Sequence, residues 1–138
     1  MDRFTDKVVL VTGAASGIGR ATAERLAAEG ATLSLTDVNL EGLEETAATC
    51  RDLGATVRAE FADVSSEESV AASVGGTVEE LGRLDVLVNV AGILQFKDAR
   101  STTLEDWNRI IGVNLTGTFL MCREALPYLL QTKGNIVN

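Results

Sequence analysis

Three glycines with fixed spacing form the most informative part of the sequence. Residues 12–19 read TGAASGIG and lie between an apolar run and a stretch of helical period. Gly13 permits a tight turn, Gly17 lets a ligand approach the backbone closely, and Gly19 lets the next helix pack tightly against a sheet. The N-terminus of that helix offers free N–H groups and a partial positive charge. We therefore expect this turn to bind a diphosphate group.

A carboxylate at the end of the next apolar run narrows the identity of the ligand. Asp37 stands 18 residues after Gly19, and an acidic residue near this distance binds the adenosine ribose in dinucleotide-binding folds. The charge of Asp37 would repel the 2′-phosphate of NADP, and Val38 after it offers no cationic partner for that phosphate. The predicted cofactor is therefore NAD. The alternative is a helix-entry turn that binds nothing. We expect Arg20, the nearest cation, to be a first-turn helix residue that faces solvent or a carboxylate.

The composition excludes several classes of function. The chain has 138 residues, enough for one domain, and its 46% hydrophobic and 23% charged residues are typical of a soluble globular protein. A formal net charge of -8 leaves no basic surface for nucleic acid. We find no signal peptide and no apolar run long enough to span a bilayer, so we expect a cytoplasmic protein without a membrane partner.

Two residue types restrict the possible chemistry further. The sequence contains no histidine, which excludes Ser-His-Asp triads, Cys-His nucleophiles and metal sites with His ligands. Cys50 and Cys122 belong to no CxxC pair, so we expect reduced cysteines on helices and no metal site.

The spacing of apolar runs predicts an α/β fold. Short runs rich in Val, Ile and Leu alternate with longer stretches of helical period, as in repeated strand and crossover-helix units. We predict a doubly wound, Rossmann-like parallel sheet with helices on both faces and the strand order 3-2-1-4-5. The predicted strands are 7–12, 32–37, 57–61, 84–89 and 135–138, and the predicted helices are 17–29, 40–53, 65–81 and 104–131.

Local signals predict where the later helices begin and weaken. Ser65 with Glu68, and Thr103 with Asp106, have the spacing of capping boxes. The adjacent glycines at 75–76 predict a weak or frayed middle in the third helix. Interruptions in the last helix at Gly112, Gly117 and Pro127 favour two segments.

Several motifs, taken in order, resemble the fingerprint of short-chain dehydrogenases/reductases. The spacing Gly13-x3-Gly17-x-Gly19 differs from the GxGxxG of other dinucleotide folds and is similar to that family's glycine motif. The residues NVAG at 89–92 resemble its NNAG motif, with Val90 in place of the second Asn. The resemblance covers the whole chain in register. The departure at Val90 replaces a polar side chain by an apolar one, which puts only the hydrogen bonds of the second Asn in doubt.

The resemblance implies roles for individual residues. Asp63 and Val64 match the pair that contacts adenine, Asn89 would steady the sheet, and the backbone of Ala91 and Gly92 would pass the nicotinamide ribose. Asn114 matches the family's catalytic helix Asn, whose main-chain carbonyl helps to hold a water of the proton relay. The expected cofactor-binding residues are Thr12, Gly13, Ser16, Gly17, Ile18, Gly19, Asp37, Asp63, Val64, Asn89, Ala91 and Gly92.

The resemblance breaks at the catalytic residues. In the family, a catalytic Ser follows the fifth strand and a Tyr-x-x-x-Lys pair lies further on, but this sequence ends at Asn138. Tyr128 is the only tyrosine, and Thr132 stands four residues later, so we expect Tyr128 to be a packing or surface residue. We therefore interpret residues 1–138 as an incomplete NAD-binding domain, truncated at the fifth strand.

The leading hypothesis is the N-terminal part of an NAD-dependent oxidoreductase that transfers hydride between NAD(H) and a small alcohol or carbonyl compound. The resemblance implies a homo-oligomer, a dimer or tetramer, for the complete enzyme and inactivity for this chain alone. One alternative is a non-catalytic NAD-binding module or pseudoenzyme subunit. Another is a damaged gene product without a function of its own.

Overall fold

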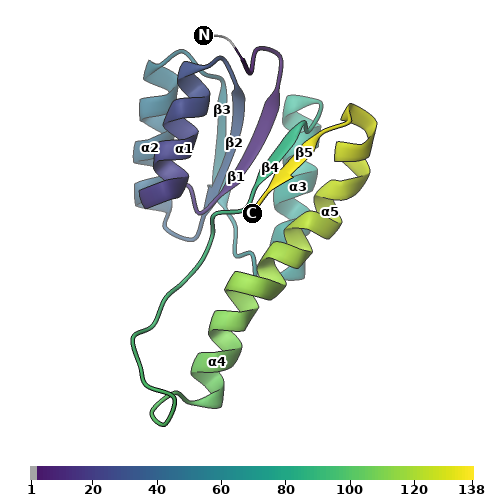
Figure 1. Cartoon of the computed structure of the whole chain (residues 1–138). Helices are drawn as coiled ribbons and strands as arrows, with labels where there is room; N and C mark the ends of the chain where they lie inside the picture. Colours follow the sequence, from purple (N-terminus) through teal and green to yellow (C-terminus); the bar gives the residue numbers. More distant parts are fainter. Residues whose placement is uncertain (1–2) are drawn as a thin grey trace.

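Five parallel strands form one sheet in the order β3-β2-β1-β4-β5, as predicted, in a computed structural model that describes residues 3–138 (Figure 1). The strands are β1 (Val8–Thr12), β2 (Thr32–Asp37), β3 (Val57–Phe61), β4 (Val86–Val88) and β5 (Asn135–Val137). The helices are α1 (Gly17–Ala28), α2 (Leu40–Asp52), α3 (Glu67–Leu81), α4 (Leu104–Ile111) and α5 (Thr118–Thr132), with a π-helix, η1 (Gly112–Gly117), between the last two. The predicted α/β fold class is confirmed.

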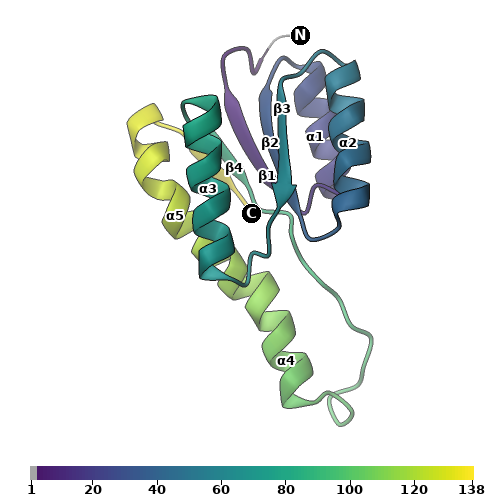
Figure 2. The same cartoon turned by 180° about the vertical axis from the view of Figure 1, so that it is seen from behind.

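The sheet lies between two layers of helices. Helices α1 and α2 cover one face and α3 and α5 the other, as the view from behind makes clear (Figure 2). Val9 and Val11 of β1 pack into the core under α1 and α2, whereas Leu10 packs with Leu87 under α3 and α5. Because both faces are covered, β1 is apolar at every position but its last, as parallel strands usually are.

The start of the third helix corrects one prediction. The capping box of Ser65 and Glu68 does not form: Ser66 is the N-cap, and its hydroxyl accepts from the backbone N–H of Ser69 at 3.3 Å. The Ser65 hydroxyl donates instead to Asp63 Oδ1 at 2.6 Å. The hydroxyl group of Ser65, the predicted N-cap, is bound to the Asp63 carboxylate. Ser66 therefore caps the helix, and α3 begins at Glu67.

The two glycines inside α3 do not interrupt it. A Cβ at Gly76 would lie 2.1 Å from Nη2 of Arg58, whose side chain is 9% exposed and pairs with Glu60 and Glu80. Gly76 therefore makes room for a nearly buried guanidinium of β3. A Cβ at Gly75 would meet no atom within 4 Å, so nothing in the packing requires that glycine.

The long segment before β5 has the predicted two parts. The capping box of Thr103 and Asp106 starts α4, with 3.0 Å from Asp106 N to Thr103 Oγ1 and 3.1 Å from Thr103 N to Asp106 Oδ2. The interruption is the π-helical turn η1, and Pro127 lies inside an otherwise continuous α5. Within residues 3–138, no helix is both long and apolar enough to cross a membrane.

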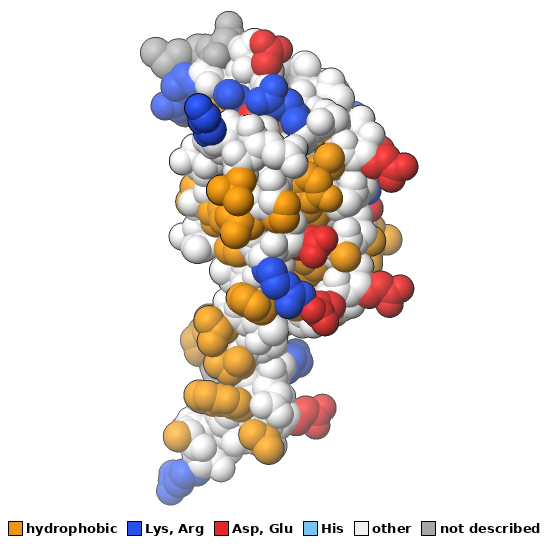
Figure 3. Space-filling view, turned by 90° about the vertical axis from the view of Figure 1, so that its right-hand side faces the viewer, with side chains coloured by type: hydrophobic (Ala, Val, Ile, Leu, Met, Phe, Trp, Pro, Cys, Tyr) orange, Lys and Arg blue, Asp and Glu red, His pale blue; other side chains and the backbone are white. Residues whose placement is uncertain are grey.

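A stripe of exposed apolar side chains follows α4, η1 and α5 (Figure 3). These residues are spaced by three, four, seven or eight positions and so share one side of the helical segment. We call this surface the apolar helix face, and it consists of Leu104, Trp107, Leu115, Phe119, Leu126 and Leu130.

Candidate nucleotide-binding site

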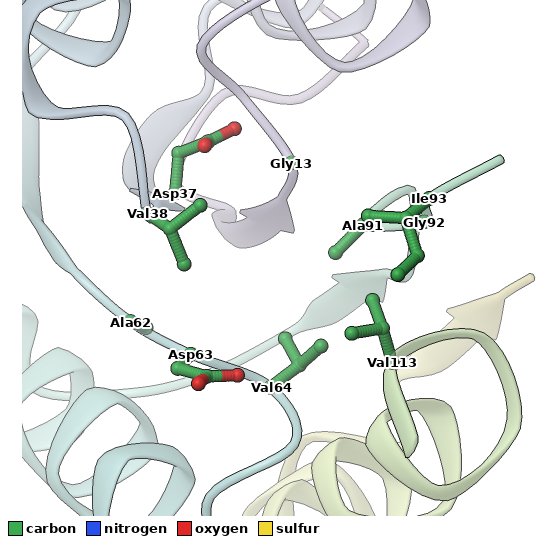
Figure 4. A pocket seen from close by; sticks show the side chains of 10 residues that line it. All are labelled: Gly13, Asp37, Val38, Ala62, Asp63, Val64, Ala91, Gly92, Ile93 and Val113. Carbon is green, nitrogen blue, oxygen red and sulfur yellow. The ribbon is translucent and has the colours of Figure 1, made fainter. Parts of the chain in front are cut away.

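A cavity of about 120 Å³ lies at the carboxyl ends of the strands (Figure 4). It lies beside β1 and β4, where the strand order reverses, which is the place where doubly wound sheets bind their ligands. Six predicted residues line it together: Gly13, Asp37, Asp63, Val64, Ala91 and Gly92. Sequence reasoning missed four more lining residues: Val38, Ala62, Ile93 and Val113.

The glycine turn has a separate constraint at each glycine. Gly13 has φ +66°, and a Cβ there would lie 2.8 Å from the backbone N and Cα of Ala91. Gly17 has φ +52°, and a Cβ there would meet no atom within 4 Å, so the backbone is open on that side. A Cβ on Gly19 would lie 2.0 Å from the carbonyl oxygen of Gly13. The role predicted for Gly19 is therefore corrected, because its nearest neighbours belong to its own turn and not to the sheet.

The other predicted residues of the turn do not line the cavity. Ser16 is the N-cap of α1, but its side chain makes no capping hydrogen bond. Ile18 is 75% exposed in the first turn of that helix. Thr12 is buried at the end of β1, and its Oγ1 accepts from the backbone N–H groups of Val90 and Ala91, both at 3.0 Å.

The Asp37 carboxylate is held by the backbone and points toward the glycine turn (Figure 4). Its Oδ2 accepts from Ala15 N and its Oδ1 from Asn39 N, both at 2.9 Å. Each carboxylate oxygen has a further lone pair. The carboxylate can therefore accept a hydrogen bond from a ligand hydroxyl without losing the contacts that orient it.

Arg20 is not available to bind a ligand phosphate. Its Nη2 lies 2.8 Å from the carbonyl oxygen of Ala15 and 3.0 Å from Glu45 Oε2, and its Nε lies 3.0 Å from Thr46 Oγ1. The expectation that Arg20 faces a carboxylate is confirmed. Among residues 3–138, no Lys or Arg lines the cavity.

Two valines form an apolar part of the cavity on the side of Asp37. Val38 is 60% exposed at the end of β2, and Val64 is 6% exposed after β3. Asp63 beside Val64 is held by its own loop, since its Oδ1 accepts from Ser65 N at 2.9 Å. Side chains of this kind can contact an aromatic base, because they supply contact area without polar groups that would need partners.

Asn114 braces the opposite side of the cavity from within η1. Its Oδ1 accepts from Ile93 N at 2.8 Å and its Nδ2 donates to Ile93 O at 2.9 Å. The main-chain carbonyl of Asn114 accepts from Thr118 Oγ1 at 3.1 Å. The side chain of Asn114 therefore positions the loop after β4.

Asn89, directly after β4, hydrogen-bonds to the edge strand β5 and to the residue that follows it. Its backbone N–H donates to Val137 O at 2.8 Å, and its Nδ2 donates to Asn138 Oδ1 at 2.7 Å. The side chain of Val90 packs against the core under α1 and α2. The replacement of the second Asn therefore leaves the backbone contact with Thr12 in place.

The remaining candidate groups lie away from the cavity. Tyr128 packs against the core under α3 and α5, in agreement with its predicted packing role. Cys50 and Cys122 are free, and burial raises the pKa of the Cys50 thiol to about 11. Over the described range 3–138, we find no group of three or more His, Cys, Asp or Glu residues able to hold a metal ion.

Comparison with known proteins finds relatives that are similar in sequence over the whole chain. Levodione reductase of Leifsonia aquatica is 46% identical over 140 residues, which cover 99% of this chain and 52% of that protein. D-Threitol dehydrogenase of Mycolicibacterium smegmatis is 40% identical over 135 residues, covering 98% of this chain and 52% of that protein. The chain thus spans about half the length of the curated relatives it matches.

Solved structures agree with the fold. NAD⁺-bound xylitol dehydrogenase superposes with a TM-score of 0.94 at 38% identity, over 99% of this chain and 53% of that one. Carveol dehydrogenase of Mycobacterium avium, in complex with NAD, gives 0.92 at 32% identity, over 99% and 55%. The family model for short chain dehydrogenases matches residues 7–138. The chain therefore belongs to the short-chain dehydrogenase family.

Proposed function

We propose that this chain binds NAD(H) for an oxidoreductase that interconverts an alcohol and a carbonyl compound. The observation that carries the proposal is the Asp37 carboxylate, which lines the cavity while the nearest cation, Arg20, is held elsewhere. A carboxylate at this point accepts from free ribose hydroxyls and repels a 2′-phosphate. This argument favours NAD over NADP.

We assign the parts of the dinucleotide to different residues of the site. Asp37, Val38 and Val64 would hold the adenosine. The N-terminus of α1 would hold the diphosphate, because the first N–H groups of a helix have no partner within the helix. Gly17 leaves that surface open, because no atom lies within 4 Å of the space its Cβ would take. Gly92 and Ile93, in the loop that Asn114 braces, would hold the nicotinamide side.

We place the proton-transfer groups in residues beyond this sequence. The cofactor supplies a hydride acceptor or donor when bound, and a proton must move to or from the substrate oxygen in the same reaction. Tyr128 packs on the core side and Thr132 donates to Leu84 O, so neither acts on a substrate. We propose that residues 1–138 form the cofactor-binding part of a domain completed by a Ser and a Tyr-x-x-x-Lys pair.

Similarity to named enzymes supports the proposed substrate class. The relatives include a D-threitol dehydrogenase and a meso-2,3-butanediol dehydrogenase of Serratia marcescens, at 40% and 41% identity. Small alcohols and their carbonyl counterparts are the proposed substrates. The apolar helix face supports the further proposal that the complete enzyme is a homo-oligomer, since large exposed apolar surfaces usually mark interfaces.

The second candidate is a cofactor-binding module without chemistry. Both candidates predict NADH binding. Turnover of small alcohols by the protein as its gene encodes it separates them, since only the enzyme reduces NAD⁺ in their presence.

Titration with NADH and NADPH tests cofactor choice. We expect NADH to bind and NADPH to bind at least about tenfold more weakly, and we expect Asp37→Ser to narrow that difference by removing the negative charge. Asp52→Ser, at the exposed end of α2, is the matched control and should leave the ratio unchanged. Equal or tighter NADPH binding by the unaltered protein would contradict the proposal.

A further inference from the structure

The π-helical turn η1 touches the two sides of the cavity. At its C-terminal end, Gly117 is buried against Val64, which lines the adenosine side. In its middle, Asn114 holds both backbone polar groups of Ile93 on the opposite side. Val113, directly before Asn114 in η1, lines the cavity itself. One short segment therefore contacts residues that belong to both halves of the proposed dinucleotide site.

The contact at Gly117 leaves no room for a side chain. A Cβ there would lie 2.6 Å from Val64 Cγ2, 3.0 Å from Val64 Cβ and 3.1 Å from Val64 O. Val64 is 6% exposed, and a β-branched side chain has few alternative rotamers. A residue larger than glycine would therefore move the backbone at Val64, the helix, or both.

The glycine at the other end of η1 is not constrained in this way. A Cβ at Gly112 would lie 3.9 Å from Ser65 Cβ, which is an ordinary van der Waals contact. Both glycines have the same cost of helix propensity. Any difference between substitutions at Gly112 and Gly117 therefore reports the contact with Val64.

We propose that Gly117 is a positioning residue for cofactor binding, because it sets the distance between η1 and Val64 and hence the width of the adenosine side of the cavity. The inference rests on the proposed binding of NAD(H). Gly117 contacts Val64 and does not line the cavity. Its effect on the cofactor is therefore transmitted through Val64.

Titration of the intact protein with NADH and with ADP-ribose tests this role. Gly117→Ala should weaken NADH binding by about tenfold, as expected when a packed site is overfilled. Binding of ADP-ribose, which lacks nicotinamide, should weaken by the same factor, because Val64, the residue that is displaced, lines the adenosine side of the cavity. Gly112→Ala should change neither affinity by more than about twofold. An unchanged NADH affinity in a folded Gly117→Ala protein would overturn the proposal.

Changes at Val64 examine the same contact from its other side. Val64→Ala removes the Cγ2 atom, so the additional effect of Gly117→Ala should shrink when both changes are combined. Val64→Ile adds a methyl group against Gly117 and should weaken NADH binding even if Gly117→Ala does not fold. An equal loss with and without Val64→Ala, or no loss with Val64→Ile, would overturn the proposal. Failure of the unaltered protein to bind NADH would instead contradict the proposed function.

Discussion

The hydroxyl oxygen of Thr12 lies 3.0 Å from the backbone nitrogen of Ala91. The same oxygen accepts from Val90 N at 3.0 Å, so one side chain at the end of β1 holds the backbone that follows β4. Ala91 lines the cavity, and the adjacent Gly13 approaches it so closely that a Cβ would clash. The Thr12 side chain therefore fixes the position of the loop after β4 relative to the glycine turn.

We expect Thr12→Val to lower both stability and NADH affinity. The substitution keeps the shape of the side chain but leaves two N–H groups without an acceptor, at a cost of about 1–3 kcal/mol. Urea denaturation and NADH titration measure the two effects. Thr22→Val, at a half-buried position on α1, is the matched control, and equal behaviour of the two variants would contradict the role of Thr12.

Removal of the Asn114 amide should loosen the loop after β4. Asn114→Ala deletes both hydrogen bonds to Ile93, and each such bond contributes about 0.5–1.5 kcal/mol. Hydrogen exchange should become faster at the Ile93 amide while the amides of β1 remain protected. Asn108→Ala on exposed α4 should leave the exchange at Ile93 as it is. Unchanged exchange in the Asn114 variant would show that the bracing contact is not formed in solution.

Replacement by alanine at two adjacent glycines of α3 should change the free energy of unfolding in opposite directions. Gly75→Ala meets no atom within 4 Å, so it should stabilise the protein by about 0.5–1 kcal/mol through helix propensity. Gly76→Ala displaces the Arg58 guanidinium from Glu60 and Glu80 and should destabilise it by about 1–3 kcal/mol. Chemical denaturation of both variants gives the comparison. A stabilising Gly76→Ala would mean that Arg58 moves aside freely.

Glu29 should make part of the stability dependent on acid pH. Hydrogen bonds from Arg3 and Arg25 hold the pKa of this buried carboxyl near 2, well below its usual value. A carboxyl with a depressed folded pKa stabilises fully above its unfolded pKa, about 4.3, and this contribution is lost as the pH falls toward 2. Glu29→Gln should therefore lose less stability than the unaltered protein between about pH 4.5 and 2.

The control for this change is Glu79→Gln, on the exposed side of α3. Thermal unfolding followed across the acid range gives the comparison. Parallel curves for Glu29→Gln and the unaltered protein would show that the Arg3 and Arg25 contacts do not stabilise the ionised form.

The strands could be predicted because local patterns indicate them, and their order could be predicted because it is that of a doubly wound fold. A parallel strand covered on both faces is a short apolar run, and β1 and β2 match the predicted runs to within one residue. The glycine turn was predictable for the same reason, since its three glycines are close in sequence. Asp37 was predictable because it stands at the end of the next predicted strand. Six of the twelve predicted cofactor-binding residues line one cavity.

The features that sequence reasoning missed depend on contacts between distant elements. Gly76 gives no local sign that it makes room for Arg58 on β3. Val113 lines the cavity from within a π-helical turn, and a π-helix is rare and usually a single turn inside an α-helix. Ser65 has the spacing of a cap, but Asp63 competes successfully for its hydroxyl.

The most direct test of the account is a map of backbone amide shifts by NMR as NADH is added. We predict that the largest changes fall at the glycine turn, 13–19, and at Asp37, Val64 and Gly92, all at the carboxyl ends of the strands. The amino ends of the strands offer the competing location, because Arg3, Lys7 and Lys133 line a cavity there that could attract a diphosphate. Shift changes confined to the amino ends of the strands, or no saturable shift changes at all, would contradict the assignment of the nucleotide-binding site.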